Sequence, residues 1–202
     1  LRAIFSLNQD GVVQLADTYN HLSNAMDATA GDLLNIANRA GSSAKLIGLS
    51  GGEVGALGAA MLALKTPPEV AATSINALLM RLATADKQGA RFQGALERMG
   101  MSASGLKAAL AEDGQGAILD FLRTVQQSDD VVGNLSDLFG AEYADDIAKL
   151  VGSLDTYEQA VRLAGDQTGA AGSMFREYEQ RSATTQNQLQ LLNNTWTAFK
   201  NV

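Results

Sequence analysis

Apolar residues recur every three or four positions along most of this chain, which is the spacing of one face of an α-helix. The pattern is clearest between residues 46 and 82, where two such series follow each other across a short polar turn. Their members are Val54, Leu57, Met61 and Leu64, then Ile75, Leu78, Leu79 and Leu82. Alternating runs of β-branched and aromatic residues, typical of strands, are missing. The pattern predicts an all-α fold, a multi-helix bundle of short helices joined by glycine-rich turns, with a longer C-terminal helix.

Two helix starts in this region carry the same signature. Ser50-Gly51-Gly52-Glu53 reads as a capping box, in which a hydroxyl and a carboxylate cover unpaired amides at a helix start. Thr66-Pro67-Pro68-Glu69 repeats it, with proline in the first turn. Small residues also occupy every fourth position of the first helix: Gly51, Gly55, Ala59 and Ala63. Such a ladder predicts that another helix approaches closely.

The remaining helices are expected from similar signals. The expected ranges are 8–26, 29–40 (opened by a Thr29-x-x-Asp32 cap), 43–48, 86–99, 104–111 and four further segments around 118–125, 131–139, 143–151 and 157–161. Gly100 and Gly140 are expected to end the helices that precede them. We interpret Gly114-Gln115-Gly116 as a turn, because no strand precedes it and no Lys-Ser/Thr pair follows, as a phosphate-binding loop would require.

The last forty residues differ in kind. After a loose stretch with Gly165, Gly169 and Gly172, apolar or small residues follow a heptad repeat and form what we name the heptad seam. It consists of Phe175, Tyr178, Ser182, Thr185, Leu189, Leu192, Trp196 and Phe199. A 3.5-residue period favours a coiled coil or a long bundle helix. Two outcomes stay open, self-association through the 173–200 helix and packing of this helix on the preceding core. We expect a helical core over 1–165, then a glycine-rich hinge and long helix over 166–202 that leads to a missing part of the chain.

Several of these segments resemble, in order and spacing, the conserved core of phage tail tape measure proteins. The likeness lies in the "GLS-x-x-E…ALGA" run, in the helix after the 66–68 turn, in Leu15-Ala16-Asp17 with Asn20, and in Ala28 through Leu34. It continues through residues 95–101 and Leu138-Phe139-Gly140, and covers roughly residues 15 to 165. The 66–68 turn departs from the pattern, which has a glycine-containing connection there.

The resemblance implies a structural virion component that takes part in tail assembly and tail-length determination. It implies partners among tail-tube, tail-initiator and tail-assembly chaperone proteins, and a location in the lumen of the tail tube, with the host cytoplasm as the place of assembly. Such proteins are long, and this chain begins at Leu1 without an initiator methionine, so we expect it to be a fragment.

Composition excludes several other classes. The net charge is −7 and the 15 basic residues are scattered, which argues against binding of nucleic-acid phosphates. We hypothesise that a protein sharing a tube with DNA should not adhere to it. The absence of cysteine excludes disulfides and thiol chemistry. The apolar stretch Leu46–Leu64 approaches the length of a membrane span, but Glu53 and five glycines favour a buried helix pair and make membrane contact by this segment an unfavoured alternative.

No residue pattern indicates a reaction centre. His21 is the only histidine and has no cysteine to work with, so we expect an ordinary helix histidine at the surface or partly buried. The acidic pairs are Glu112-Asp113, Asp129-Asp130 and Asp145-Asp146. The first two are expected at helix starts and the third on a solvent-facing side. We therefore assign no catalytic, cofactor-binding or metal-ligating residue, and predict no cofactor and no enzymatic activity. The alternatives are a generic bacterial all-α interaction module and a peptidoglycan hydrolase with two facing carboxylates.

Overall fold

The computed structural model describes the backbone of residues 1–200 and the side chains of this range except 186, 187 and 191–200. Within these residues the chain forms twelve α-helices and one 3₁₀ helix, and no strand, which confirms the all-α prediction. The helices are α1 (Gln9–Ala25), α2 (Ala30–Leu46), α3 (Gly51–Ala63), α4 (Pro68–Ala83), η1 (Ala85–Lys87), α5 (Ala90–Arg98), α6 (Ala103–Glu112), α7 (Gly114–Gln126), α8 (Val131–Phe139), α9 (Ala141–Gly152), α10 (Leu154–Gly165), α11 (Gln167–Ala170) and α12 (Ser173–Lys200).

Only one of the two predicted capping boxes forms. The Ser50 hydroxyl accepts the Glu53 amide at 3.3 Å, and the Glu53 carboxylate accepts the Ser50 amide at 2.6 Å, so the first box is confirmed. The second prediction is wrong. Helix α4 is preceded by Pro67 as its cap residue, without any side-chain cap, and the buried Thr66 hydroxyl has no hydrogen-bond partner. The cause is local: a residue before proline is held in extended conformation, so Pro67 (ψ 145°) cannot be helical ahead of Pro68.

Most other helix starts use the short side chain of the cap residue. Each accepts the amide three residues further on, which satisfies one of the unpaired donors of the first turn. These residues are Asn8, Thr29, Ser102, Asp113, Asp130 and Asp166. Because Asp113 is the cap residue, Gly114 opens α7, and our interpretation of residues 114–116 as a turn is wrong. A Cβ at Gly114 would collide with the carbonyl oxygen of Ile47, so this glycine permits a close approach of two backbones.

Three further expectations are corrected. Helix α2 runs without a break to Leu46, so the separate 43–48 helix does not exist. Gly41 lies inside α2, and its missing side chain leaves room for Ile4 and Phe5 to pack against the helix. Asp86 lies in the 3₁₀ helix η1, and α5 begins only at Ala90. The 165–172 segment is not loose throughout, because it contains the four-residue helix α11.

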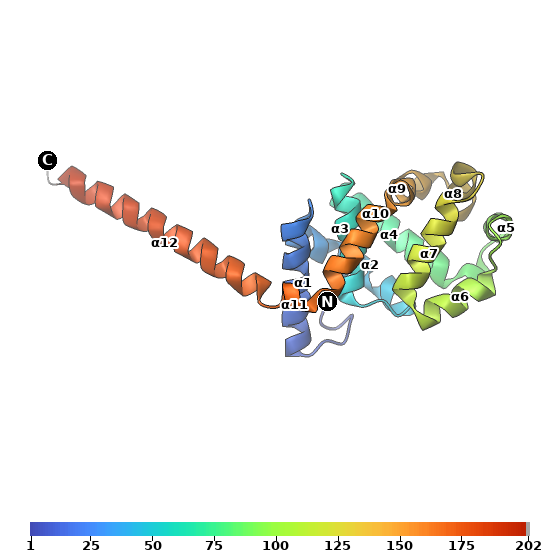
Figure 1. The fold of residues 1–202 in the computed structure, drawn as a ribbon, viewed down its shortest axis with the longest axis horizontal. Coiled ribbons are helices and arrows are strands. Elements are labelled where there is room, and N and C mark those ends of the chain that lie inside the picture. Colours follow the sequence, from blue (N-terminus) through green and yellow to red (C-terminus); the bar gives the residue numbers. More distant parts are fainter. Residues whose placement is uncertain (201–202) are drawn as a thin grey trace.

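Helix α3 lies at the centre of the core, and nearly all its residues are buried. It packs against α2, α1 and α10, while α2 also lies along α4 (Figure 1). The small-residue ladder is what admits α1. Cβ atoms at Gly51 and Gly55 would meet the Leu15 and Tyr19 side chains at or inside contact distance. Tyr19 is 1% exposed, and its hydroxyl donates to the Gly51 carbonyl at 2.8 Å.

The second half of the core is built from α5 to α9. Phe121 and Phe139 meet edge to face, with ring centroids 6.2 Å apart. Arg98 joins α5 to α8 through the buried Asn134 side chain (3.1 and 2.9 Å) and Asp137 (2.6 Å). Gly100 and Gly140 take positive φ angles, both +72°, and end the helices expected to stop there.

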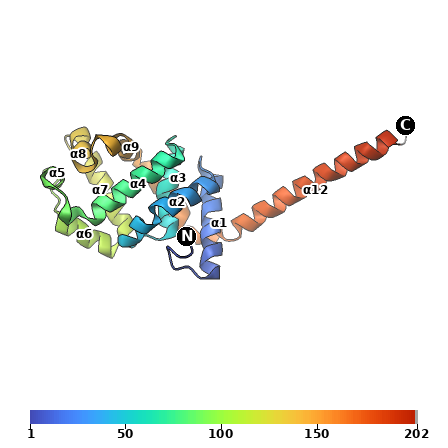
Figure 2. The same cartoon turned by 180° about the vertical axis from the view of Figure 1, so that it is seen from behind.

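Helix α12 leaves this core and projects away from it (Figures 1 and 2). Its 28 residues correspond to about 42 Å at 1.5 Å per residue. None of the described helices combines the length and the apolarity that crossing a membrane requires.

Candidate functional site

The long helix is attached to the core at α1, and the attachment is polar. Asp17 is 7% exposed, and its two carboxylate oxygens accept the backbone amides of Gly172 (2.8 Å) and Met174 (3.0 Å). An acidic side chain at a helix start pairs with unsatisfied amides and with the positive end of the helix dipole. Asp17 thus acts as a cap for α12 although it lies more than 150 residues earlier in the chain.

Neighbouring groups complete this junction. The side-chain amide of Asn20 donates a hydrogen bond to the Ser173 hydroxyl at 2.8 Å, and both residues are buried. His21 is partly buried, as expected, and its Nε2 lies 3.9 Å from the Asp166 carboxylate without forming a hydrogen bond. Arg176 donates to the carbonyls of Ala171 (2.6 Å) and Gly169 (3.3 Å), which ties the start of α12 to the preceding turn.

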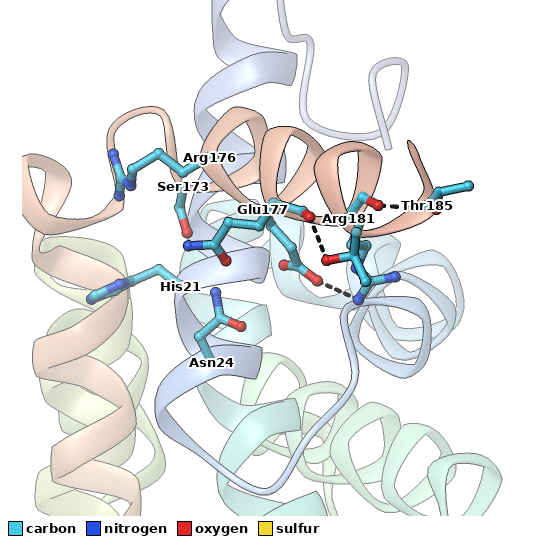
Figure 3. A pocket seen from close by; sticks show the side chains of 9 residues that line it. His21, Asn24, Ser173, Arg176, Glu177, Arg181 and Thr185 are labelled. Atoms are coloured by element: carbon cyan, nitrogen blue, oxygen red, sulfur yellow. Dashed lines mark hydrogen bonds and ion pairs between the residues drawn. The ribbon is translucent and has the colours of Figure 1, made fainter. Parts of the chain in front are cut away.

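A polar groove of about 810 Å³ lies between α1 and the first turns of α12 (Figure 3). His21 and Asn24 line one side, and Arg176, Gln180 and Thr184 line the other. Glu177, the one carboxylate of the groove, is paired with Arg181 and faces it in the close-up. Ser173 also lines the groove, but its hydroxyl is hydrogen-bonded to Asn20, and His21 Nε2 has no hydrogen-bond partner among the described residues, so these two groups are not paired as a nucleophile and its base would be.

The heptad seam does not pack on the core where its side chains are described. Phe175, Tyr178 and Leu189 are 61%, 67% and 61% exposed, whereas Ser173 and Glu177 face the core. The side chains of Leu192, Trp196 and Phe199 lie outside those that the structure describes. The three large apolar side chains of the seam that the structure describes are therefore not covered by the core.

The acidic pairs are separated and mostly have structural roles. Asp113 and Asp130 cap α7 and α8, while Glu112 and Asp129 are exposed beside them. The expectation that the third pair faces solvent is half wrong. Asp145 is exposed, but Asp146 is partly buried.

Asp146 is held between two helices. It accepts hydrogen bonds from the Ser74 hydroxyl and from Lys149, each at 3.0 Å. Among the described residues no three His, Asp or Glu side chains (the chain has no Cys) converge as metal ligands would.

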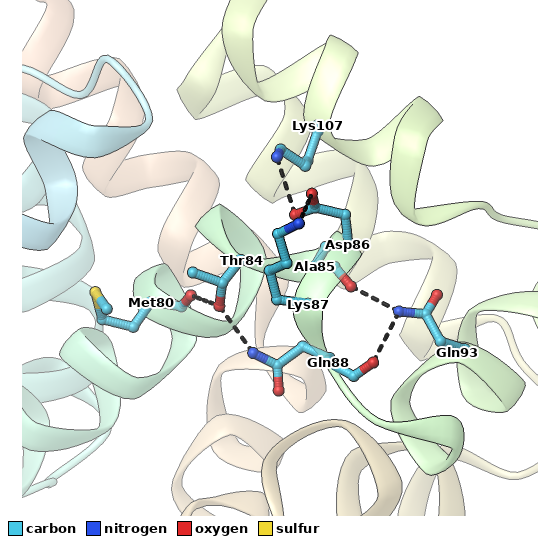
Figure 4. Close-up of polar contacts among 8 residues, drawn as sticks. All are labelled: Met80, Thr84, Ala85, Asp86, Lys87, Gln88, Gln93 and Lys107. Atoms are coloured by element: carbon cyan, nitrogen blue, oxygen red, sulfur yellow. Dashed lines mark hydrogen bonds and ion pairs between the residues drawn. The ribbon is translucent and has the colours of Figure 1, made fainter.

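A second polar network joins η1 to its neighbours (Figure 4). Lys107 of α6 donates to Asp86 at 2.9 Å, and this hydrogen bond holds the pKa of Asp86 below its ordinary value. On the other side, Gln93 donates to the carbonyls of Ala85 (2.7 Å) and Gln88 (3.2 Å). The network fixes the turn between α4 and α5.

The negative charge is concentrated in one part of the chain. Residues 112–158 contain eleven acidic and two basic residues, a net charge of −9, which leaves +2 for the other residues. This range forms α7 to α9 and the start of α10, and α8 and α9 lie at the end of the core away from α12 (Figure 1).

Comparison with known proteins places this architecture. The model of the phage-related minor tail protein family matches residues 1–152, about three quarters of the chain. This chain belongs to that family. The probable tape measure protein of Halomonas phage phiHAP-1 is 33% identical to it over 180 residues. That alignment covers 86% of this chain but 20% of the relative, so the chain spans about a fifth of the relative's length. No solved structure matches.

Membership confirms the resemblance inferred from the sequence. Asp17 and Asn20 belong to the motif that carried this resemblance, and the structure places both at the junction with α12. Sequence reasoning had not assigned them this task. The only signal was two polar side chains on a helix whose neighbours Leu15, Tyr19 and Leu22 point into the core.

Proposed function

We propose that this chain is a structural segment of a phage tail protein of the tape measure type, taking part in tail assembly and tail-length determination by contact and without a reaction centre. The observation that carries the proposal is the pairing of the family match with a folded core from which one long helix projects with an unpartnered apolar seam. The proposed place of action is the lumen of the tail tube, after assembly in the host cytoplasm.

Within such a protein, we assign these residues to docking or anchoring and not to measurement. A ruler maps chain length onto tube length, and 202 residues in one continuous helix would extend for about 300 Å. Here residues 9–165 fold back on themselves in short helices, so only α12 has the form of a ruler element. The proposed division is a core over 1–165 and a hinge with a long helix over 166–202.

Electron microscopy of tails from a phage encoding this segment would test the assignment. Removing residues 9–165 in frame should reduce the number of completed tails and leave the length of the remaining ones unchanged. Removing an equal number of residues from a continuous helical part of the same protein should shorten tails by about 240 Å. Normal numbers of tails, shortened by that amount after loss of the core, would refute the docking role.

Self-association through α12 is the favoured use of the heptad seam, because its described residues are not covered by the core. Light scattering after size exclusion should show concentration-dependent oligomers. Changing Phe175, Tyr178 and Leu189 together to Gln should reduce them, while Gln180→Ala, at an exposed position on the opposite side of the helix, should not. A monomer at all concentrations up to about 100 µM would refute this part.

Tail-tube, tail-initiator or tail-assembly chaperone proteins are the proposed partners, and nucleic acid is not one. The concentration of negative charge in residues 112–158 supports weak affinity for DNA, because phosphate binding depends on clustered Lys and Arg. Gel-shift titration at low salt should show no complex at micromolar protein. Tight binding independent of sequence would contradict the proposal.

A further inference from the structure

We propose that Asp17 is a latch which holds α12 at one angle to the core, and that release of this latch lets the helix pivot as an arm about the 165–172 segment. The inference concerns the geometry of the chain alone and does not depend on which partner α12 meets.

The contacts that fix the direction of α12 are mainly hydrogen bonds to α1. Asp17 accepts the amide of Gly172, just before the helix, and that of Met174 in its first turn, and the Asn20 side chain donates to Ser173. Apolar burial adds little at this point, since Met174 and Phe175 in the same turn are 44% and 61% exposed. Both Asp17 oxygens are used in a buried position, so this one carboxylate holds the start of α12 against α1 at two adjacent points.

Space around the start of α12 permits a different direction. The polar groove of about 810 Å³ lies on one side of it, and a second groove of about 580 Å³ lies on the other, between Met174, Tyr178 and the start of α2. The helix thus rests on α1 without being enclosed. A rotation to either side meets open volume before it meets the core.

The chain before α12 is built to bend. Three of the eight residues from Gly165 to Gly172 are glycine, and Gly172 has a φ of +71°, a conformation that other residues rarely adopt. Helix α11, within this segment, has only four residues. When the latch opens, the freed amides of the first turn can bind water, so a released state leaves no donor buried and unpaired.

Spin-label distance measurements on the 202-residue chain test the latch. The chain has no cysteine, so Asn35→Cys on α2 and Gln188→Cys on α12, both exposed, can be labelled without a background. The parent pair should give one narrow distance distribution. Asp17→Ala should broaden it at least twofold, while Asp10→Ala, the same change at an exposed carboxylate of α1, should not.

Asn20→Ala provides the second variant, because it removes one bridging hydrogen bond and leaves both Asp17 contacts. It should broaden the distribution less than Asp17→Ala does. Circular dichroism reports whether each variant keeps the folded core. Unchanged distributions in both folded variants would overturn the latch. Loss of the folded core in both would overturn it too, because the contact would then hold the core and not the arm.

Discussion

The close contact between α1 and α3 makes opposite predictions for two glycines three residues apart. Alanine at Gly55 would bring its Cβ within 3.0 Å of the Tyr19 Cδ1 atom, and closer still to Cε1. Alanine at Gly52 would find its nearest neighbour, the Thr18 methyl group, at 3.7 Å, which is ordinary contact. Both glycines lie in α3, so the comparison isolates packing from backbone effects.

Two opposing free-energy contributions decide whether each substitution stabilises or destabilises the fold. Replacing glycine by alanine in a helix gains up to about 1 kcal/mol. Overpacking a tight core costs about 1–3 kcal/mol, and a shift of the Tyr19 ring would also strain its hydrogen bond to Gly51, worth about 1 kcal/mol. Gly55→Ala should therefore destabilise the fold by roughly 1–3 kcal/mol, whereas Gly52→Ala should be neutral or stabilising by up to about 1 kcal/mol.

Urea unfolding followed by circular dichroism measures both variants. The midpoint should fall for Gly55→Ala and hold or rise for Gly52→Ala. In a double-mutant cycle, a Tyr19→Leu background should reduce the cost of Gly55→Ala, because the ring that causes the overlap is gone. An equal or higher midpoint for Gly55→Ala than for Gly52→Ala would refute the account of the ladder.

Three other predictions concern stability. Ser50→Ala should lower the free energy of unfolding by about 1 kcal/mol. Thr66→Val should be neutral or stabilising, because the buried Thr66 hydroxyl has no hydrogen-bond partner. Urea midpoints in the reverse order would show that the second capping box forms after all. Burial raises the pKa of Tyr157 above its ordinary value of 10.0. Its contribution to stability is thus intact below pH ~10 and is lost above it, by up to about 1.4 kcal/mol per pH unit. Tyr157→Phe should flatten the loss of stability above pH ~10, and an unchanged slope in denaturation at a series of alkaline pH values would contradict this. Asn134→Ala should cost about 1–3 kcal/mol, and Asp137→Ala less than about 1 kcal/mol, because only the former is buried; calorimetric melting separates them, and equal costs would argue against the role of burial.

Features set by nearby residues could be predicted from the sequence. Helix caps act over three positions, and the spacing of small residues directly reports a face of a helix, so the Ser50 box and the ladder were both foreseen. The failure at Thr66 is also local. Two consecutive prolines move the helix start by one residue, and this places Glu69 one position too early for the box.

Features set by distant residues could not be predicted. Nothing near Gly41 shows that Ile4 and Phe5 will pack upon it, so the helix expected over 29–40 stops just before a glycine that in fact lies inside α2. The partner of Asp17 lies more than 150 residues away, and the Ser74 partner of Asp146 lies 72 residues away. Both carboxylates lie at positions typical of a helix, and nothing in the neighbouring sequence indicates that they are buried.

Because α10 packs beside α3, the core can be completed only late in the synthesis of the chain. Helix α10 (Leu154–Gly165) covers α3 (Gly51–Ala63), which is synthesised about a hundred residues earlier. The surface of α3 therefore stays exposed to solvent while the ribosome adds the intervening residues. Nascent chains interrupted before residue 165 would carry this apolar surface uncovered, and uncovered apolar surface promotes aggregation. Messenger RNAs truncated before the codon for residue 165 should therefore yield insoluble protein. Messenger RNAs that extend just past this codon should yield soluble protein.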